Sequence, residues 1–191
     1  MRRRRWSGIV VVALLAASTS FAEEACKPVH LTTPALSLAE VFATADAKAK
    51  AWKADAVPAR LGNTILGPLD AKGRSTDWAL MFYSPSADAR LNVTTFRGTL
   101  TCYADPGSAG RLPDLKPDFF RDGAKLYALA KEHGGDLIAG GFAVMIQTAA
   151  APSDRHATWY ITFSQQTGKN GGVSVIVDAN TGAVEQVIHD D

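Results

Sequence analysis

The chain has little of what several common function classes need. Among its 191 residues are only two cysteines and four histidines, and 20 basic residues almost balance 19 acidic ones. Two cysteines are too few for a small disulfide-dense scaffold, and a net charge of +1 gives nucleic acid no electrostatic attraction. The composition has neither the short repeat of a fibrous protein nor the low hydrophobicity of a disordered one. A globular chain of one domain, or of two small ones, remains.

The chain also lacks the residue spacings on which catalysis and metal binding depend. It contains no His-x-x-x-His, Glu-x-x-His or Cys-x-x-Cys, so a zinc site has no support. The segment 153–156 collects Ser, Asp and His, but the fold rather than adjacency assembles a catalytic triad, and a polar turn is the simpler interpretation. We therefore expect no enzyme activity, no cofactor and no bound metal. The four histidines are His30, His133, His156 and His189.

Residues 1–22 have the pattern of a secretory signal peptide. Basic residues 2–5 precede an apolar stretch at 8–17, and Ser20 and Ala22 place small residues before a cleavage point. The apolar stretch is about ten residues long, whereas a membrane-spanning helix needs roughly 20. We expect cleavage after Ala22 and export to the periplasm or the medium. Without its four arginines the mature chain has 16 basic and 19 acidic residues, a net of −3, and no membrane span.

Both cysteines, Cys26 and Cys102, remain after this cleavage. In an oxidising compartment an even pair predicts one disulfide. Closing a loop of about 77 residues would destabilise the unfolded chain by ~4.5 kcal/mol in the chain-entropy model. The alternative, a reactive thiol pair, lacks the close spacing that such pairs have.

The mature chain repeats itself at an offset of 81 residues. Trp78 then aligns with Trp159 and Phe82 with Phe163, and the helical patterns at 37–51 and 118–132 also coincide. Ser37 with Glu40 predicts a capping box for the first helix, whereas Asp118 is the expected N-cap of the second and Gly134-Gly135 its end. Strand patterns follow each helix, at 60–66, 77–84, 91–97 and 99–103, and at 137–148, 157–165, 172–178 and 183–188.

This order predicts an α+β fold of two tandem repeats, each a helix packed on a four-stranded antiparallel sheet. The expected units are a first repeat at 23–104, a linker at 105–117 that is rich in Pro and Gly, and a second repeat at 118–191.

The end of the chain resembles the PepSY domain family. The resemblance rests on a strand that opens with Trp, at 159–163, and on a second strand, at 173–177, that runs into Asp-Ala-Asn-Thr-Gly-Ala-Val at 178–184. Residues 93–100 look like a degenerate copy, and the tandem layout is similar to that of the secreted β-lactamase inhibitor proteins. The resemblance implies an exported, non-catalytic module that restrains a protease or binds a protein partner.

The hairpin motif has a physical explanation of its own. Asp178 can accept amide hydrogen bonds from residues two or three further on, Asn180 lies within that turn, and Gly182 supplies a positive φ. The start of the motif is similar to a calcium-binding EF-hand loop, but the fifth position is Gly182 and the twelfth is His189, where ligands are required. We therefore interpret the motif as a turn.

Alternation along the strands divides the aromatic residues between two faces. Trp78, Phe82 and their counterparts in the repeat are expected in the core against the helices. The opposite face would carry large side chains among small polar residues such as Thr162 and Ser174, which suits a partner surface. The alternative is that the two repeats bury these faces against each other. The predicted partner-binding residues are Met81, Tyr83, Tyr160 and Ile176.

Two functions are compatible with these features. The first is a PepSY-like module that binds a protein or peptide in the cell envelope, with inhibition of a protease or other hydrolase as one form. The second is a periplasmic carrier or sensor of a small molecule, which would need a pocket between helix and sheet or between the repeats.

Overall fold

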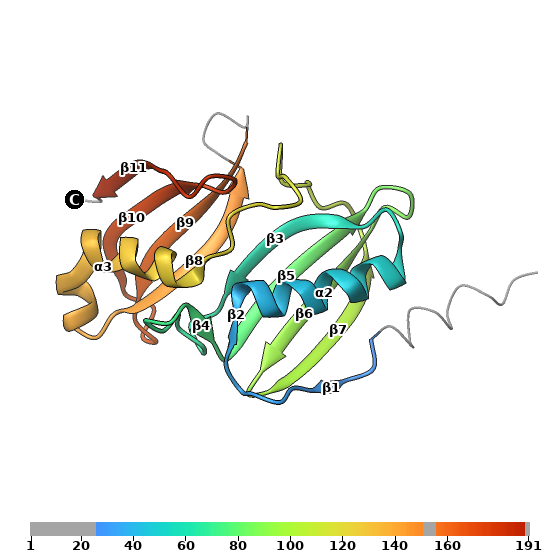
Figure 1. Cartoon of the computed structure of the whole chain (residues 1–191), viewed down its shortest axis with the longest axis horizontal. Coiled ribbons are helices and arrows are strands. Elements are labelled where there is room, and N and C mark those ends of the chain that lie inside the picture. Colours follow the sequence, from blue (N-terminus) through green and yellow to red (C-terminus); the bar gives the residue numbers. More distant parts are fainter. Residues whose placement is uncertain (1–25, 151–155, 190–191) are drawn as a thin grey trace, which may run out of the picture.

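The computed structural model describes residues 26–150 and 156–189, and these residues are mostly β-strand. Within them, nine strands form one antiparallel sheet in the order β1-β7-β6-β5-β3-β8-β9-β10-β11, and β2 and β4 form a two-stranded sheet. The two helices of this part of the chain, α2 (Leu38–Trp52) and α3 (Gly123–Ala139), lie on one face of the large sheet (Figure 1). The strands are β1 (Val29–His30), β2 (Leu36–Ser37), β3 (Val57–Asn63), β4 (Arg74–Ser75), β5 (Asp77–Ser84), β6 (Ala89–Phe96), β7 (Thr99–Pro106), β8 (Ala143–Ala150), β9 (Ala157–Ser164), β10 (Asn170–Asp178) and β11 (Val184–His189).

The predicted fold class, an α+β tandem in which each helix covers its own four-stranded sheet, is wrong. β3 pairs with β8 through Gly62 and Gln147, so the strands of both halves belong to one sheet. Separate sheets would leave unpaired backbone groups on the facing edges of these two strands, and pairing them satisfies those groups. Gly62 permits the close approach, because a Cβ atom there would lie 2.6 Å from the carbonyl oxygen of Ile146.

Two buried side chains extend the junction between β3 and β8. Thr148 Oγ1 accepts a hydrogen bond from the Leu61 amide at 2.8 Å and donates one to the Leu61 carbonyl at 3.3 Å. Asn63 Oδ1 accepts from the Ile146 amide at 2.7 Å, and its Nδ2 donates to the Val144 carbonyl at 3.3 Å. At this junction, side chains therefore pair with backbone amides and carbonyls that would bond to backbone groups of the neighbouring strand in a regular sheet.

Helix α2 begins as the sequence predicts. The Ser37 hydroxyl accepts a hydrogen bond from the Glu40 amide at 3.3 Å, and the Glu40 carboxylate accepts one from the Ser37 amide at 2.8 Å. This reciprocal pair satisfies two amides that the first turn of a helix cannot pair internally. The apolar residues that recur at helical spacing are buried toward the sheet: Leu38, Val41, Phe42, Ala45, Ala49 and Trp52.

Helix α3 differs from the prediction at both ends. Its N-cap is Asp122 instead of Asp118, and it continues to Ala139 instead of ending at Gly134-Gly135. Gly134 has φ −141° and ψ 29° within the helix, and the ring of Phe163 occupies the place that a Cβ atom would take. The helix is therefore kinked at Gly134, where the prediction placed its end, and the missing Cβ lets the kinked helix approach the sheet. A second helical segment continues to Ala139, so residues 137–139 of the strand predicted at 137–148 are helical.

The disulfide between Cys26 and Cys102 is present, as predicted. It joins the start of the described chain to β7, next to the short pairing of β1 with β7. The predicted signal peptide, residues 1–22, lies outside the described residues. In the part of the chain that is described, no helix is long and apolar enough to cross a membrane.

Candidate functional site

The two described helices lie on one face of the nine-stranded sheet (Figure 1), and the opposite face has strands from both halves, which meet at the Gly62–Gln147 pair. Strand register places Met81 of β5 beside Asn92 of β6, and Tyr160 of β9 beside Gln147 of β8. Gln147 in turn pairs with Gly62, so these residues share one face. We call this face the open face. The two halves lie side by side in one sheet, which excludes the alternative that they bury their open faces against each other.

Three of the four predicted partner-binding residues are accessible on the open face. Met81, Tyr83 and Tyr160 are each half-buried, as expected for side chains on a sheet surface. Ile176 is the exception, because only 1% of it is exposed. Its neighbours on the flanking strands are Tyr160 and Gln186, whose longer side chains stand beside it. Ile176 therefore does not form part of an accessible surface.

The sequence analysis missed two aromatic residues that belong to the open face. Tyr103 on β7 is 59% exposed and Phe96 on β6 is 47% exposed. Register links Tyr103 to the predicted set, because Tyr103 pairs with Asn92, which pairs with Met81. Phe96 lies four residues after Asn92 on β6 and so shares its face. The alternation in residues 99–103 contained a signal for Tyr103. It lies two positions after the polar residue Thr101, so both side chains are expected on the same, polar face of the strand.

Two polar contacts fix the conformation of side chains at the β5–β7 end of the open face. The Tyr83 hydroxyl donates a hydrogen bond to Asp88 Oδ1 at 2.9 Å, and this bond raises the pKa of Tyr83 above its usual value. Arg90 forms a two-pronged ion pair with Asp105, with N–O distances of 3.1 and 3.0 Å. A tyrosine held by a hydrogen bond, beside a paired arginine and aspartate, has less conformational freedom to lose when a partner binds.

A shallow hollow of about 300 Å³ lies on the open face beside Tyr160. It is lined by Gln147, Ala149, Tyr160 and Thr162, from β8 and β9. The hollow combines an aromatic ring with one amide and one hydroxyl, which is the kind of site that receives a single side chain of a partner.

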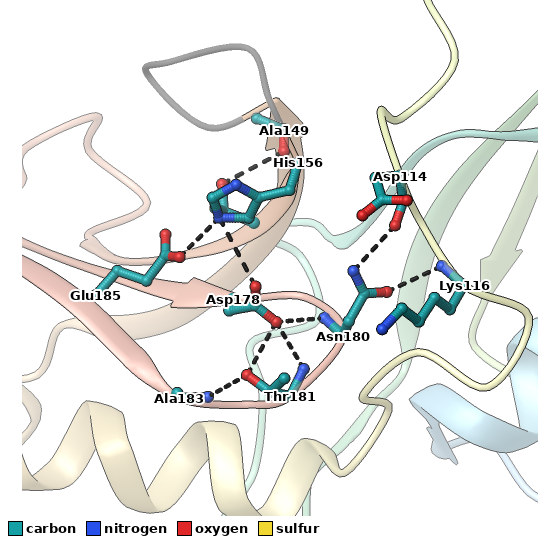
Figure 2. A network of polar contacts seen from close by, with 10 residues as sticks. Asp114, Lys116, Ala149, His156, Asp178, Asn180, Thr181, Ala183 and Glu185 are labelled. Atoms are coloured by element: carbon teal, nitrogen blue, oxygen red, sulfur yellow. Dashed lines mark hydrogen bonds and ion pairs between the residues drawn. The ribbon is translucent and has the colours of Figure 1, made fainter.

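The predicted turn motif forms an extended polar network between β10 and β11 (Figure 2). Asp178 Oδ1 accepts hydrogen bonds from the amides of Asn180 at 2.9 Å and of Thr181 at 2.6 Å, and from the Thr181 hydroxyl at 2.9 Å. Burial raises the pKa of Asp178, but these hydrogen bonds outweigh it and lower the pKa below its usual value. Gly182 has φ +76°, as the turn requires, and the ring of Phe120 lies 2.8 Å from where its Cβ would be.

Asn180 connects this hairpin to residues 107–122, the connecting segment between β7 and α3. Its Oδ1 accepts from the Lys116 amide at 2.9 Å, and its Nδ2 donates to the Asp114 carbonyl at 3.0 Å (Figure 2). The Trp159 indole also donates to the Phe120 carbonyl at 3.0 Å. The connecting segment is thus bound to the second half at both ends of the motif that resembles PepSY.

The fold also brings His156 close to two carboxylates. His156 Nε2 lies 2.6 Å from Glu185 Oε1 and 3.7 Å from Asp178 Oδ2 (Figure 2). The sequence analysis interpreted residues 153–156 as a polar turn; residues 153–155 lie outside the described residues, and His156 directly precedes β9. Asp178 and Glu185 lie 22 and 29 residues after His156, and these spacings match no metal-ligand motif. The sequence therefore held no signal for this cluster.

A groove of about 660 Å³ lies on the helix side, between α2, the start of β3 and the connecting segment. Its apolar lining includes Phe42 and Phe119, whose rings pack edge to face with centroids 5.0 Å apart. The Arg121 guanidinium lies over both rings. The charged residues at the groove are Asp46, Lys50, Arg111, Asp114 and Lys116.

Comparisons with models of protein families, with curated proteins and with solved structures find no match to this chain. The resemblance to PepSY domains therefore stays a prediction from sequence, and the site is argued from its own geometry.

Proposed function

We propose that the protein is an exported, non-catalytic module that binds a protein or peptide partner through the open face of its sheet. The observation that supports the proposal is that both described helices lie on one face of a single sheet, so the opposite face has strands from both halves, which meet at the Gly62–Gln147 pair. The PepSY-like pattern at 159–184 supports the same class of function, and inhibition of a protease or other hydrolase is one form of it.

The open face is large enough for a specific complex. Nine strands at a spacing of about 4.8 Å span about 38 Å, and strands of eight residues are about 26 Å long, which gives about 1,000 Å². A standard protein interface buries about 800 Å² on each partner. The dimensions of the face therefore match those of one interface that uses both halves of the sheet.

The chemistry of the open face also suits a protein partner. Tyr83, Tyr103 and Tyr160 lie among threonine, serine and asparagine side chains, with Met81 near the centre. Tyrosine and methionine are enriched at interfaces, because they bury much area at a small cost in conformational entropy. We expect Tyr160, which borders the hollow, to contribute most to affinity.

A crosslinking pull-down from the cell envelope tests this proposal. The wild type is compared with a Tyr83→Ala, Tyr160→Ala double variant and with a control, Lys131→Ala, Glu132→Ala, on the exposed side of α3. The proposal expects the same partner with wild type and control, and at least a tenfold loss with the tyrosine variant. Equal capture by all three proteins, each folded and disulfide-bonded, would refute it.

Export is tested separately, by sequencing the N-terminus of the protein recovered from its own cells. We expect the mature chain to begin at Glu23, because Ser20 and Ala22 provide the small residues that signal peptidase needs. An N-terminus at Met1 would contradict export by this signal.

The second candidate function, a carrier or sensor of a small molecule, is favoured by the groove on the helix side. Its volume of about 660 Å³ falls within the range of ligand pockets, and Phe42, Leu112 and Phe119 give it an apolar lining. Native mass spectrometry of the protein purified from its own cells distinguishes the two candidates. A retained small molecule that Phe119→Ala releases supports the carrier function, whereas an unliganded protein with a captured partner supports the binding module.

A further inference from the structure

We propose that His156, Asp178 and Glu185 form a binding site for one divalent transition-metal ion, with zinc as the preferred ion. The site goes beyond the proposed function, because it is independent of any partner on the open face. Its three residues come from neighbouring strands: His156 directly precedes β9, Asp178 ends β10, and Glu185 is near the start of β11.

The spacing of the candidate ligand atoms fits a single small ion. One ligand atom from each side chain can be chosen so that all three lie within 4.8 Å of one another. In a tetrahedral site with zinc–ligand distances of 2.0–2.2 Å, ligand atoms are about 3.3 Å apart. The observed 2.6 Å and 3.7 Å from His156 Nε2 to the two carboxylates lie on either side of this value. Small side-chain rotations therefore bring the three atoms into a coordination sphere.

The electrostatics of the cluster also favour a cation at its centre. Both carboxylates direct an oxygen at the same imidazole nitrogen, and a neutral imidazole can donate a proton from Nε2 to only one oxygen at a time. Asp178 Oδ1 is already engaged by the turn, so Oδ2 faces His156 without competing for those bonds. A divalent ion would replace the Nε2 proton and interact with both carboxylates.

The donor set selects the kind of ion. One imidazole with two carboxylates suits zinc, cobalt or nickel, whereas calcium and magnesium prefer sites made of oxygen alone. Three protein ligands leave a fourth position for water or for a side chain of another molecule. The side chains are each 21–32% exposed, so an ion can enter from solvent.

Isothermal titration calorimetry on the chelator-treated full mature chain tests the site, with zinc chloride as the probe. The expected result is one zinc per chain, a raised melting temperature, and visible absorption of a tetrahedral site when cobalt(II) replaces zinc. His156→Gln and Glu185→Gln should each weaken zinc binding by at least tenfold. His133→Gln, on α3, is the matched control and should bind as the wild type does.

Three results would overturn the proposal: no saturable zinc binding by the wild type, unchanged binding in both His156→Gln and Glu185→Gln, or equal binding of magnesium and zinc. The cobalt spectrum keeps the test independent of stability, because its intensity reports the coordination geometry of the bound ion even if a variant melts at a different temperature.

Discussion

Replacing Thr148 with valine tests whether side chains hold the two halves of the sheet together. Thr148 is 1% exposed, and its hydroxyl pairs with both the amide and the carbonyl of Leu61 across the β3–β8 junction. Valine keeps the shape of threonine but removes the hydroxyl, so both backbone groups of Leu61 lose this partner without a cavity being created.

The structure sets the size of the expected effect. A buried donor or acceptor left unpaired costs about 1–3 kcal/mol, and carbonyls tolerate this better than amides. The free energy of unfolding should therefore fall by about 2–4 kcal/mol. With a urea m-value of about 2 kcal/mol/M, the midpoint moves down by about 1–2 M.

Urea unfolding followed by tryptophan fluorescence measures this change, with the disulfide intact. The control is Thr94→Val, a half-buried threonine on β6 whose hydroxyl bonds only to that of Thr101 at 3.1 Å in the described network. This control should stay within about 0.5 kcal/mol of the wild type. A Thr148→Val midpoint equal to that of Thr94→Val would refute the role of the hydroxyl at the junction.

Three further predictions concern the rest of the fold. Cys102→Ser removes the disulfide and should lower the free energy of unfolding by about 2–5 kcal/mol in denaturant titrations, whereas no change would contradict its structural role. The hydrogen bond from the Ser86 amide is the main cause that lowers the pKa of Asp55 from its usual 3.8 to about 2. The stabilisation is therefore full above pH 3.8 and is lost as pH falls through about 2. Asp55→Asn should thus melt below the wild type at pH 6, with the gap closing toward pH 2; a gap that does not depend on pH would contradict this. Gly182→Ala should lower the melting temperature more than Gly168→Ala, because both positions have positive φ but only Gly182 has an aromatic ring in the place of a Cβ; equal losses would contradict the contact.

Local signals in the sequence predicted the features that depend on neighbouring residues. The capping box of Ser37 and Glu40, the alternation around Trp78 and the turn at Asp178 each involve residues within a few positions of one another. The disulfide was predictable for another reason, since two cysteines in a chain have only one possible pairing.

The features that the sequence analysis missed depend on contacts between distant residues. The joining of the two halves rests on Gly62, which a sequence shows only as one of 16 glycines, and on hydrogen bonds of Asn63 and Thr148 to strands more than 80 residues away. The sequence signalled a helix end at Gly134, where α3 is kinked, but the contact with Phe163 and the helical segment beyond the kink depend on packing against the sheet.

The same reason explains which of the predicted partner-binding residues are accessible. Alternation placed Met81, Tyr83 and Tyr160 together on one face, because the side-chain period of a strand is local. The burial of Ile176 depends on side chains of two other strands, and the cluster around His156 depends on the order of β9, β10 and β11.

Site-specific photo-crosslinking tests the central claim, that the open face binds a protein partner, most directly. A photoreactive amino acid is placed at Tyr103 or Tyr160 on the open face, and at Ala47 or Lys131 on the exposed sides of the two described helices. We expect the two open-face positions to crosslink to the same protein after illumination in the cells that produce the chain, and the helix positions to give no such product. Crosslinks to one partner from the helix positions alone would contradict the proposed binding surface.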